Sequence, residues 1–156
     1  MTANATDLQR VTALIGRVPQ GDFDVVVRSA DGEPMVLRNA PLLHDGTPMP
    51  TRYWLTDRDA LRRISRLEAA GGVRQAEQEI PAAHIAAAHA RYEAERDTAL
   101  PAGWAGPRPY GGVGGTRTGV KCLHAHYAHL LAGGDDPVGR WVVDRLAEQT
   151  QQEGLA

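Results

Sequence analysis

The sequence contains little cysteine, few aromatic residues and no long apolar run, and each shortage narrows what the protein can be. Cys122 is the only cysteine among 156 residues, so no disulfide forms within the chain, and such cysteine usage is typical of a reducing compartment. No apolar run approaches the roughly 20 residues that a membrane-spanning helix needs. The first ten residues also lack the charged and then apolar pattern of a signal peptide. We therefore expect a cytoplasmic protein.

An excess of charge of one sign is missing as well. The chain has 17 basic and 19 acidic side chains, a formal net charge of −2. Proteins dedicated to nucleic acids usually carry a basic excess that drives counterion release, so we expect no nucleic-acid partner. With 42% hydrophobic and 23% charged residues, the composition is that of a globular protein. We expect a single domain over residues 1–156, with its core at about 7–150 and a frayed tail at 151–156.

The spacing of apolar and turn-forming residues predicts an α+β fold, with a small N-terminal antiparallel sheet packed by four to six helices. Residues 23–27 are rich in β-branched side chains, and a turn at Asp31-Gly32 leads to a second strand at 35–37. A third strand at 52–55 is expected at the sheet edge, because the prolines before it cannot donate to a ladder.

Helical periodicity and capping residues predict the remaining elements. Thr6 and Thr56 are expected to cap the first two helices, and Asp136 to cap the last one with Pro137 at its first position. Residues 100–118 are rich in glycine and proline and are expected to form a long loop. The predicted helices are those that begin at Thr6 and Thr56, those over residues 73–80, 81–99 and 119–132, and one after Asp136.

Residues 111–129 concentrate the reactive side chains of the chain. A glycine-rich loop with Gly114 and Gly115 leads into a helix start, where unpaired backbone N–H groups favour anions. Arg117 and Lys121 add positive charge, and His129 lies on the following helix. The pattern is neither a P-loop nor a dinucleotide fingerprint, since no strand is predicted before it. We expect a site for a small, phosphate-type anion here, and a mobile surface loop is the alternative.

A metal site is a second hypothesis for the same segment. At 100° per residue, Cys122, His126 and His129 fall on one narrow helix face. Zinc or another divalent metal needs further ligands, since Cys122 and His129 lie about 10 Å apart along a straight helix. His44, Asp45, Asp57, His84 and His89 are available for that role. The corresponding function is a non-catalytic metal-binding or adaptor protein with a structural Cys/His site, and a partly solvated histidine face is the alternative.

Catalysis and partner binding are further hypotheses. Cys122 is a candidate nucleophile with His126 as its base, although a single cysteine is more often a small buried apolar residue. A stripe of arginines on the second predicted helix would suit an acidic protein partner, or it is a solvated helix face. The arginine stripe consists of Arg58, Arg62 and Arg66. The sequence leaves open whether the protein is an enzyme.

Five stretches of the chain resemble the actinobacterial domain-of-unknown-function family 501. They are residues 45–48 (DGTP), 50–55 (PTRYWL), 66–73 (RLEAAGGV), 119–126 (GVKCLHAH) and 136–139 (DPVG). The resemblance spans about residues 7–146 and implies a cytosolic actinobacterial protein, but it implies no reaction. Many members of the family carry extra cysteines near the first hairpin and after the Trp-Leu-Thr segment, where this chain has Ser29, Ala30 and Asp57.

Overall fold

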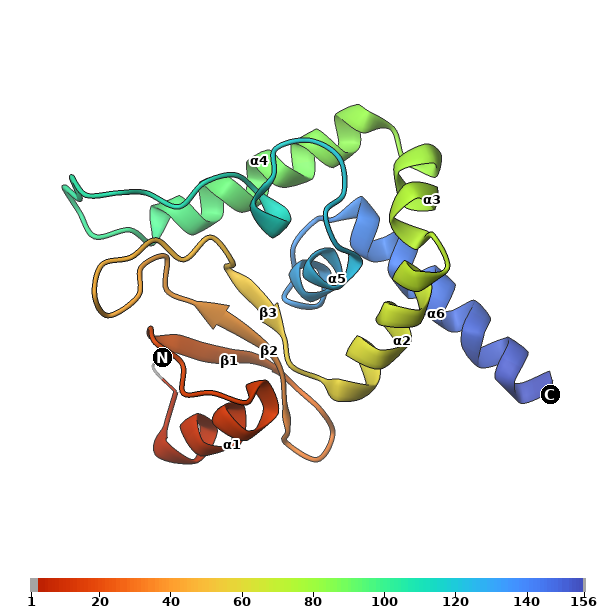
Figure 1. Ribbon diagram of the computed structural model, residues 1–156, viewed down its shortest axis with the longest axis horizontal. Coiled ribbons are helices and arrows are strands. Elements are labelled where there is room, and N and C mark those ends of the chain that lie inside the picture. The colour runs from red at the N-terminus through yellow and green to blue at the C-terminus, as the bar shows by residue number, and fades with distance from the viewer. Residues whose placement is uncertain (1–2, 156) are drawn as a thin grey trace.

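The computed structural model describes residues 3–155, in which a three-stranded antiparallel sheet is combined with six α-helices (Figure 1). This confirms the predicted α+β class. The strand order is β1-β2-β3, which places β3 at the sheet edge as expected. The strands are β1 (Phe23–Arg28), β2 (Pro34–Asn39) and β3 (Tyr53–Leu55).

The sheet separates two hydrophobic cores, because alternate residues of a strand point to opposite faces. On β2, Val36 belongs to the larger core, and Leu37 belongs to the smaller one. Helix α1 (Ala5–Ile15) covers the smaller core through Val11. On β3, Tyr53 faces the larger core, whereas Trp54 packs against the smaller one. The edge strand therefore presents side chains to both layers.

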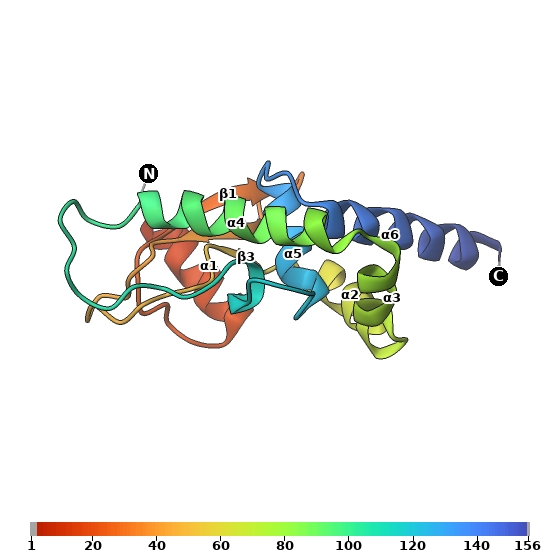
Figure 2. The ribbon, with the colours of Figure 1, turned by 90° about the horizontal axis from the view of Figure 1, so that it is seen from above.

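The remaining helices surround α5, which lies at the centre of the larger core (Figures 1 and 2). Helix α5 contacts β3, α2, α6 and the short 3-10 helix η1. The C-terminal part of α6 projects beyond the rest of the molecule (Figure 1). The bounds are α2 (Arg58–Ala69), α3 (Gly72–Glu79), α4 (Ala82–Thr98), η1 (Val113–Gly115), α5 (Leu123–Leu131) and α6 (Pro137–Leu155).

Two of the expected helix caps are wrong. Helix α1 is capped by Asn4, whose side chain accepts from the Asp7 N–H at 2.8 Å, and not by Thr6. Helix α2 is capped by Asp57 instead of Thr56. The Thr56 side chain is directed instead toward the sheet, where its hydroxyl donates to the carbonyl of Pro34 at 2.8 Å, and this bond ties α2 to the sheet.

The two C-terminal helices also differ from the prediction at one end. Helix α5 begins at Leu123 and not near residue 119. Residues 119–122 are not helical, and Cys122 directly before the helix is extended. Helix α6 continues to Leu155, where the sequence predicts a frayed tail, and residue 156 lies outside the described residues. The predicted start of α6 is confirmed, since the Asp136 carboxylate accepts from the N–H groups of Val138 and Gly139, each at 3.0 Å.

The long loop over residues 100–118 contains only the short helix η1 as regular structure. Arg96 of α4 is fully buried and holds this loop against the sheet side of the molecule. Its guanidinium donates to the carbonyl oxygens of Gly111 at 2.7 Å and Pro50 at 3.2 Å, and it pairs with Asp97 at 2.9 Å. Within residues 3–155, none of the helices has the length and apolar composition needed to cross a membrane.

Candidate functional site

The residues predicted to share one face of α5 separate into two groups. Cys122 precedes the helix in an extended conformation, with φ −151° and ψ 144°, so its side chain does not continue the helical face. It lines a surface pocket. His126 and His129 are buried at 0% and 5% exposure and point toward the start of α6. The structure therefore does not bring Cys122 together with these two histidines.

His126 and His129 bind the same carboxylate, and we call His126, His129 and Asp136 the histidine clasp. His126 Nδ1 donates to Asp136 Oδ2 at 2.8 Å, and His129 Nδ1 donates to the same oxygen at 2.9 Å. Burial by itself raises the pKa of Asp136, but the hydrogen bonds from both histidines outweigh it and hold this pKa well below its ordinary value. The clasp thus fixes α5 to α6 through a buried carboxylate that stays ionised.

The metal site expected at Cys122, His126 and His129 does not assemble. Among residues 3–155, no three histidine, cysteine or acidic side chains are arranged to hold a metal ion. Both clasp histidines use Nδ1 on Asp136, and Cys122 lies in the pocket lining. His126 Nε2 is buried without a hydrogen-bond partner, and the nearest ring is His89, with centroids 5.4 Å apart.

His89 of α4, whose ring lies next to that of His126, has a structural role. Its Nδ1 accepts from the Val113 N–H at 3.0 Å, and its Nε2 lies 2.7 Å from the carbonyl oxygen of Gly119. These contacts require a neutral ring with the proton on Nε2. Burial lowers the pKa of His89, which agrees with that state. His89 therefore holds the glycine-rich loop against α4.

A wide cavity opens between β3 and the start of α5, and we call it the Cys122 pocket. Its volume is about 630 Å³, within the usual range of small-molecule sites. Residues of β3 supply much of the apolar lining, and the start of α5, the loop before β3, η1 and the segment after α1 complete it. The lining residues are Arg17, Met49, Pro50, Thr51, Tyr53, Trp54, Leu55, Gly114, Lys121, Cys122, His124 and Ala125.

The charged side chains of this lining are all basic. Arg17, Lys121 and His124 are basic, and none of the described lining residues is acidic. The first turn of α5 also opens here without a side-chain cap, so its N–H groups add positive potential. Basic side chains, apolar residues and a helix N-terminus thus meet in this pocket.

His124 is held by a carboxylate behind the pocket. Its Nδ1 lies 3.1 Å from Glu68 Oε1 of α2. The neighbouring Cys122 thiol has the largest effect on His124, and together with Glu68 it outweighs burial and raises the pKa of His124 to about 9. The imidazole is therefore charged at neutral pH beside the thiol.

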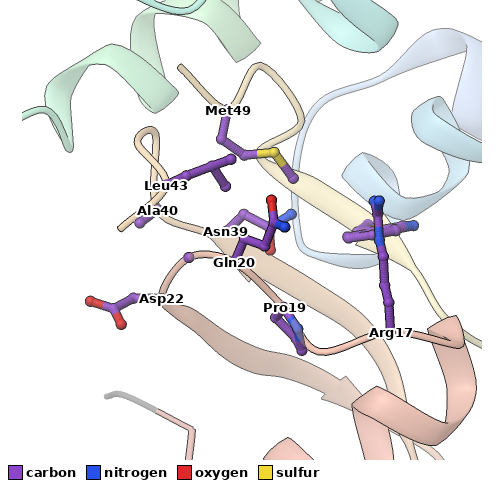
Figure 3. Close-up of a pocket in the computed structure, with 10 residues that line it drawn as sticks. Arg17, Pro19, Gln20, Asp22, Asn39, Ala40, Leu43 and Met49 are labelled. Atoms are coloured by element: carbon purple, nitrogen blue, oxygen red, sulfur yellow. The ribbon is translucent and has the colours of Figure 1, made fainter. Parts of the chain in front are cut away.

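Arg17 lies between the Cys122 pocket and a smaller cavity of about 80 Å³ (Figure 3). The two cavities share Arg17, Met49 and Trp54. Figure 3 shows Arg17 on one side of the small cavity and Leu43 and Met49 on the other. The guanidinium lies over the Trp54 ring, 5.7 Å from its centroid, in a cation–π arrangement. This contact places Arg17 beside the Trp54 ring, which lines both cavities.

The other predicted anion ligands lie outside this lining. Arg117 pairs with Glu93 at 3.1 Å and lies over the Tyr110 ring, 4.6 Å from its centroid. Gly115 is the last residue of η1 and does not line the pocket, and His129 belongs to the clasp. Of the predicted set, the structure gathers Gly114, Lys121 and Cys122.

Sequence reasoning missed three residues of this region. His124 was accessible from the sequence, since it follows Cys122 by two residues at a helix start. Arg17 and Glu68 gave no such signal, because they lie far from Cys122 along the chain and only the fold brings them near.

The arginine stripe of α2 makes contacts within the chain. Arg58 donates to the carbonyl of Ala13 at 3.0 Å, which links α2 to α1. Arg62 pairs with Asp59 at 2.6 Å, and Arg66 lies 3.6 Å from Glu153 of α6. The Arg66 contact helps to hold the projecting part of α6.

The fold and site define an α+β protein with one large basic and apolar pocket beside a buried histidine clasp. The chain belongs to the DUF501 family of proteins of unknown function, whose sequence model matches residues 25–144. The matched range includes β3, α2, α5 and the clasp, although Arg17 lies before it. A comparison with curated proteins and with solved structures finds no match.

Proposed function

We propose that the protein binds a small organic anion of the phosphate type in the Cys122 pocket. The single observation that carries this function is the one-signed lining, in which Arg17, Lys121 and His124 face a cavity of about 630 Å³ with no acidic residue among its described lining. Arg17 and Lys121 supply the positive charge for the ligand, because the charge of His124, whose pKa is raised to about 9 mainly by the thiol, is shared with Cys122 and Glu68.

The geometry also supports an apolar part of the ligand. Met49, Trp54 and Leu55 are apolar residues of the lining, and Arg17 lies over the Trp54 ring. A phosphate group between Lys121 and Arg17 would lie near the first turn of α5, and the rest of the ligand would contact the apolar residues of β3. The ligand class is therefore a phosphomonoester with an apolar group.

Binding of phenyl phosphate, compared with inorganic phosphate at constant ionic strength, tests this function. We expect the double variant Arg17→Gln with Lys121→Gln to weaken phenyl phosphate binding at least about tenfold, because two charge-assisted contacts are lost. Isothermal titration calorimetry measures the dissociation constants. Arg117→Gln is the matched control, since Arg117 lies on the glycine-rich loop but pairs with Glu93. Unchanged affinity in the double variant would remove the proposal.

We expect this binding to take place in the cytoplasm of an actinobacterium, as the family resemblance implies. Fractionation of cells that express the tagged chain from its own locus tests the location. Recovery with the membrane or outside the cell would contradict it. A structural metal site has less support than anion binding, because Cys122 lies apart from His126 and His129.

A further inference from the structure

The Cys122 pocket is lined by a nucleophile and a histidine, and a carboxylate holds that histidine from behind the pocket. Cys122 is a free thiol at the pocket lining, and His124 lines the same cavity. Glu68 comes from α2 and holds His124 Nδ1 at 3.1 Å, so Nε2 is the ring nitrogen left for the thiol and for a substrate. Cys122 is the only cysteine of the chain, and it lies at this cavity beside His124.

We infer that Cys122, His124 and Glu68 form a nucleophilic triad for acyl transfer from esters or thioesters that carry an anionic group. The inference rests on the proposed anion site, because Arg17 and Lys121 hold the substrate's charged group. His124 replaces His126 as the partner of the thiol, since His126 is buried on Asp136. Glu68 is a positioning residue that orients the imidazole.

Each group has a defined part in the reaction. The Cys122 thiolate attacks the carbonyl carbon and forms a C–S bond, and the resulting oxyanion faces the uncapped N–H groups at the start of α5. The bond to the leaving oxygen or sulfur then breaks, and charged His124 gives it a proton. Neutral His124 next takes a proton from water, hydroxide adds to the thioester, and the thiolate leaves. The products are a carboxylic acid and the alcohol or thiol, and the enzyme returns to its starting state.

The charge state of His124 agrees with this sequence of steps. The pKa of His124, raised to about 9 mainly by its contact with the thiol, keeps the imidazole protonated at neutral pH. Gly114 brings the backbone of the glycine-rich loop close to the thiol, since a Cβ there would lie 3.7 Å from Cys122 Sγ and 3.2 Å from Lys121 Cβ. The loop thus closes against the nucleophile without covering it.

Acetylation by two matched esters tests the triad separately from the anion site. One is ortho-nitrophenyl acetate, and the other is the same ester with a carboxylate para to the acetoxy group, so both transfer the same acetyl group. Release of nitrophenolate gives the rate, and intact mass with peptide mapping locates the adduct. We expect wild-type acetylation at Cys122, none in Cys122→Ala, and a rate lowered about a hundredfold in His124→Gln.

The variants and controls separate the outcomes. Glu68→Gln should slow acetylation by a smaller factor than His124→Gln, and its thermal midpoint shows whether the fold is kept. The carboxylate ester should react about tenfold faster than the neutral ester, and Lys121→Gln should reduce that preference. Arg117→Gln should leave both rates unchanged.

Two results distinguish a failure of the triad from a failure of the anion site. In the first, the protein binds phenyl phosphate, but its acetylation proceeds at the rate of a small free thiol and is not slowed by His124→Gln. This result would overturn the triad and leave the proposed function. Acetylation that depends on His124 without any preference for the charged ester would support the triad and overturn the anion site. Loss of both would overturn both.

Discussion

The start of α5 and the rest of this helix place similar side chains in opposite environments. At its start, Cys122 and His124 line an open pocket, and Glu68 engages one nitrogen of the imidazole. Further along the helix, His126 and His129 are buried, and both donate to Asp136. Both regions combine histidine with a carboxylate. Only the first leaves a cavity in which a ligand can lie.

The comparison shows how the position of a carboxylate decides the role of a histidine. Asp136 lies at the N-terminus of α6 and accepts backbone N–H groups as well as two imidazoles, so its bonding capacity is used within the fold. Glu68 is half-buried on α2 and holds His124 from behind, which leaves the front of the ring exposed to the pocket. The clasp stabilises the fold, and the pocket is available for chemistry.

Removing Asp136 is the largest expected perturbation of the clasp. Asp136→Ala should lower the free energy of unfolding by about 3–5 kcal/mol, because two buried imidazoles and two N–H groups lose their acceptor. Urea unfolding measures the change. Asp135→Ala is the matched control, since Asp135 is an exposed neighbour that pairs with Arg140 and should cost less than about 1 kcal/mol. Equal effects of the two variants would show that the clasp does not stabilise the fold.

The same variant has an expected pH signature. The folded-state pKa of Asp136 is lowered, so its contribution to stability is present above the unfolded-state value of about 3.9 and is lost as the pH falls below it. The difference between wild type and Asp136→Ala should therefore be constant at neutral pH and shrink below about pH 4. A difference that does not shrink would assign the effect to packing.

The close approach of α6 to α5 gives a prediction of intermediate size. A Cβ at Gly139 would lie 2.6 Å from Leu130 Cβ and 2.7 Å from the carbonyl oxygen of His126. Gly139→Ala should destabilise the protein by about 1–3 kcal/mol through overpacking. Gly154→Ala in the same helix meets no atom within 4 Å, so it should stabilise by up to about 1 kcal/mol through helix propensity. Thermal unfolding compares the two, and stabilisation by both would refute the close packing.

The smallest expected effect concerns the pocket. The pKa of His124 is raised to about 9, so its contribution to stability is present below the unfolded-state value of about 6.5 and is lost as the pH rises through 9. His124 is 41% exposed, and solvent screening limits the effect to about 1 kcal/mol or less. Chemical denaturation between pH 6 and pH 10 of wild type and His124→Gln measures it, with His84→Gln as control. A constant difference across this range would contradict the charged imidazole.

Much of the fold could be predicted from local signals. The β-branched residues before Asp31-Gly32 and the prolines before β3 predict the sheet and its edge, because strand propensity and missing donors act over a few residues. Asp136 with Pro137 predicts the start of α6 for the same reason. Local signals failed where a tertiary contact competes for the capping group. Thr56 does not cap α2, because its side chain is directed toward the sheet, where its hydroxyl donates to the carbonyl of Pro34.

The sequence by itself determined the α+β class, the long loop and the concentration of reactive side chains near Cys122, because these depend on composition and short-range periodicity. Only the tertiary structure decided which of those side chains act together. A helix start four residues later than expected moves Cys122 off the face of His126 and His129. Arg17 joins the pocket lining and Glu68 reaches His124 from distant segments, since the packing of α1 on the sheet and of α2 on α5 brings them there.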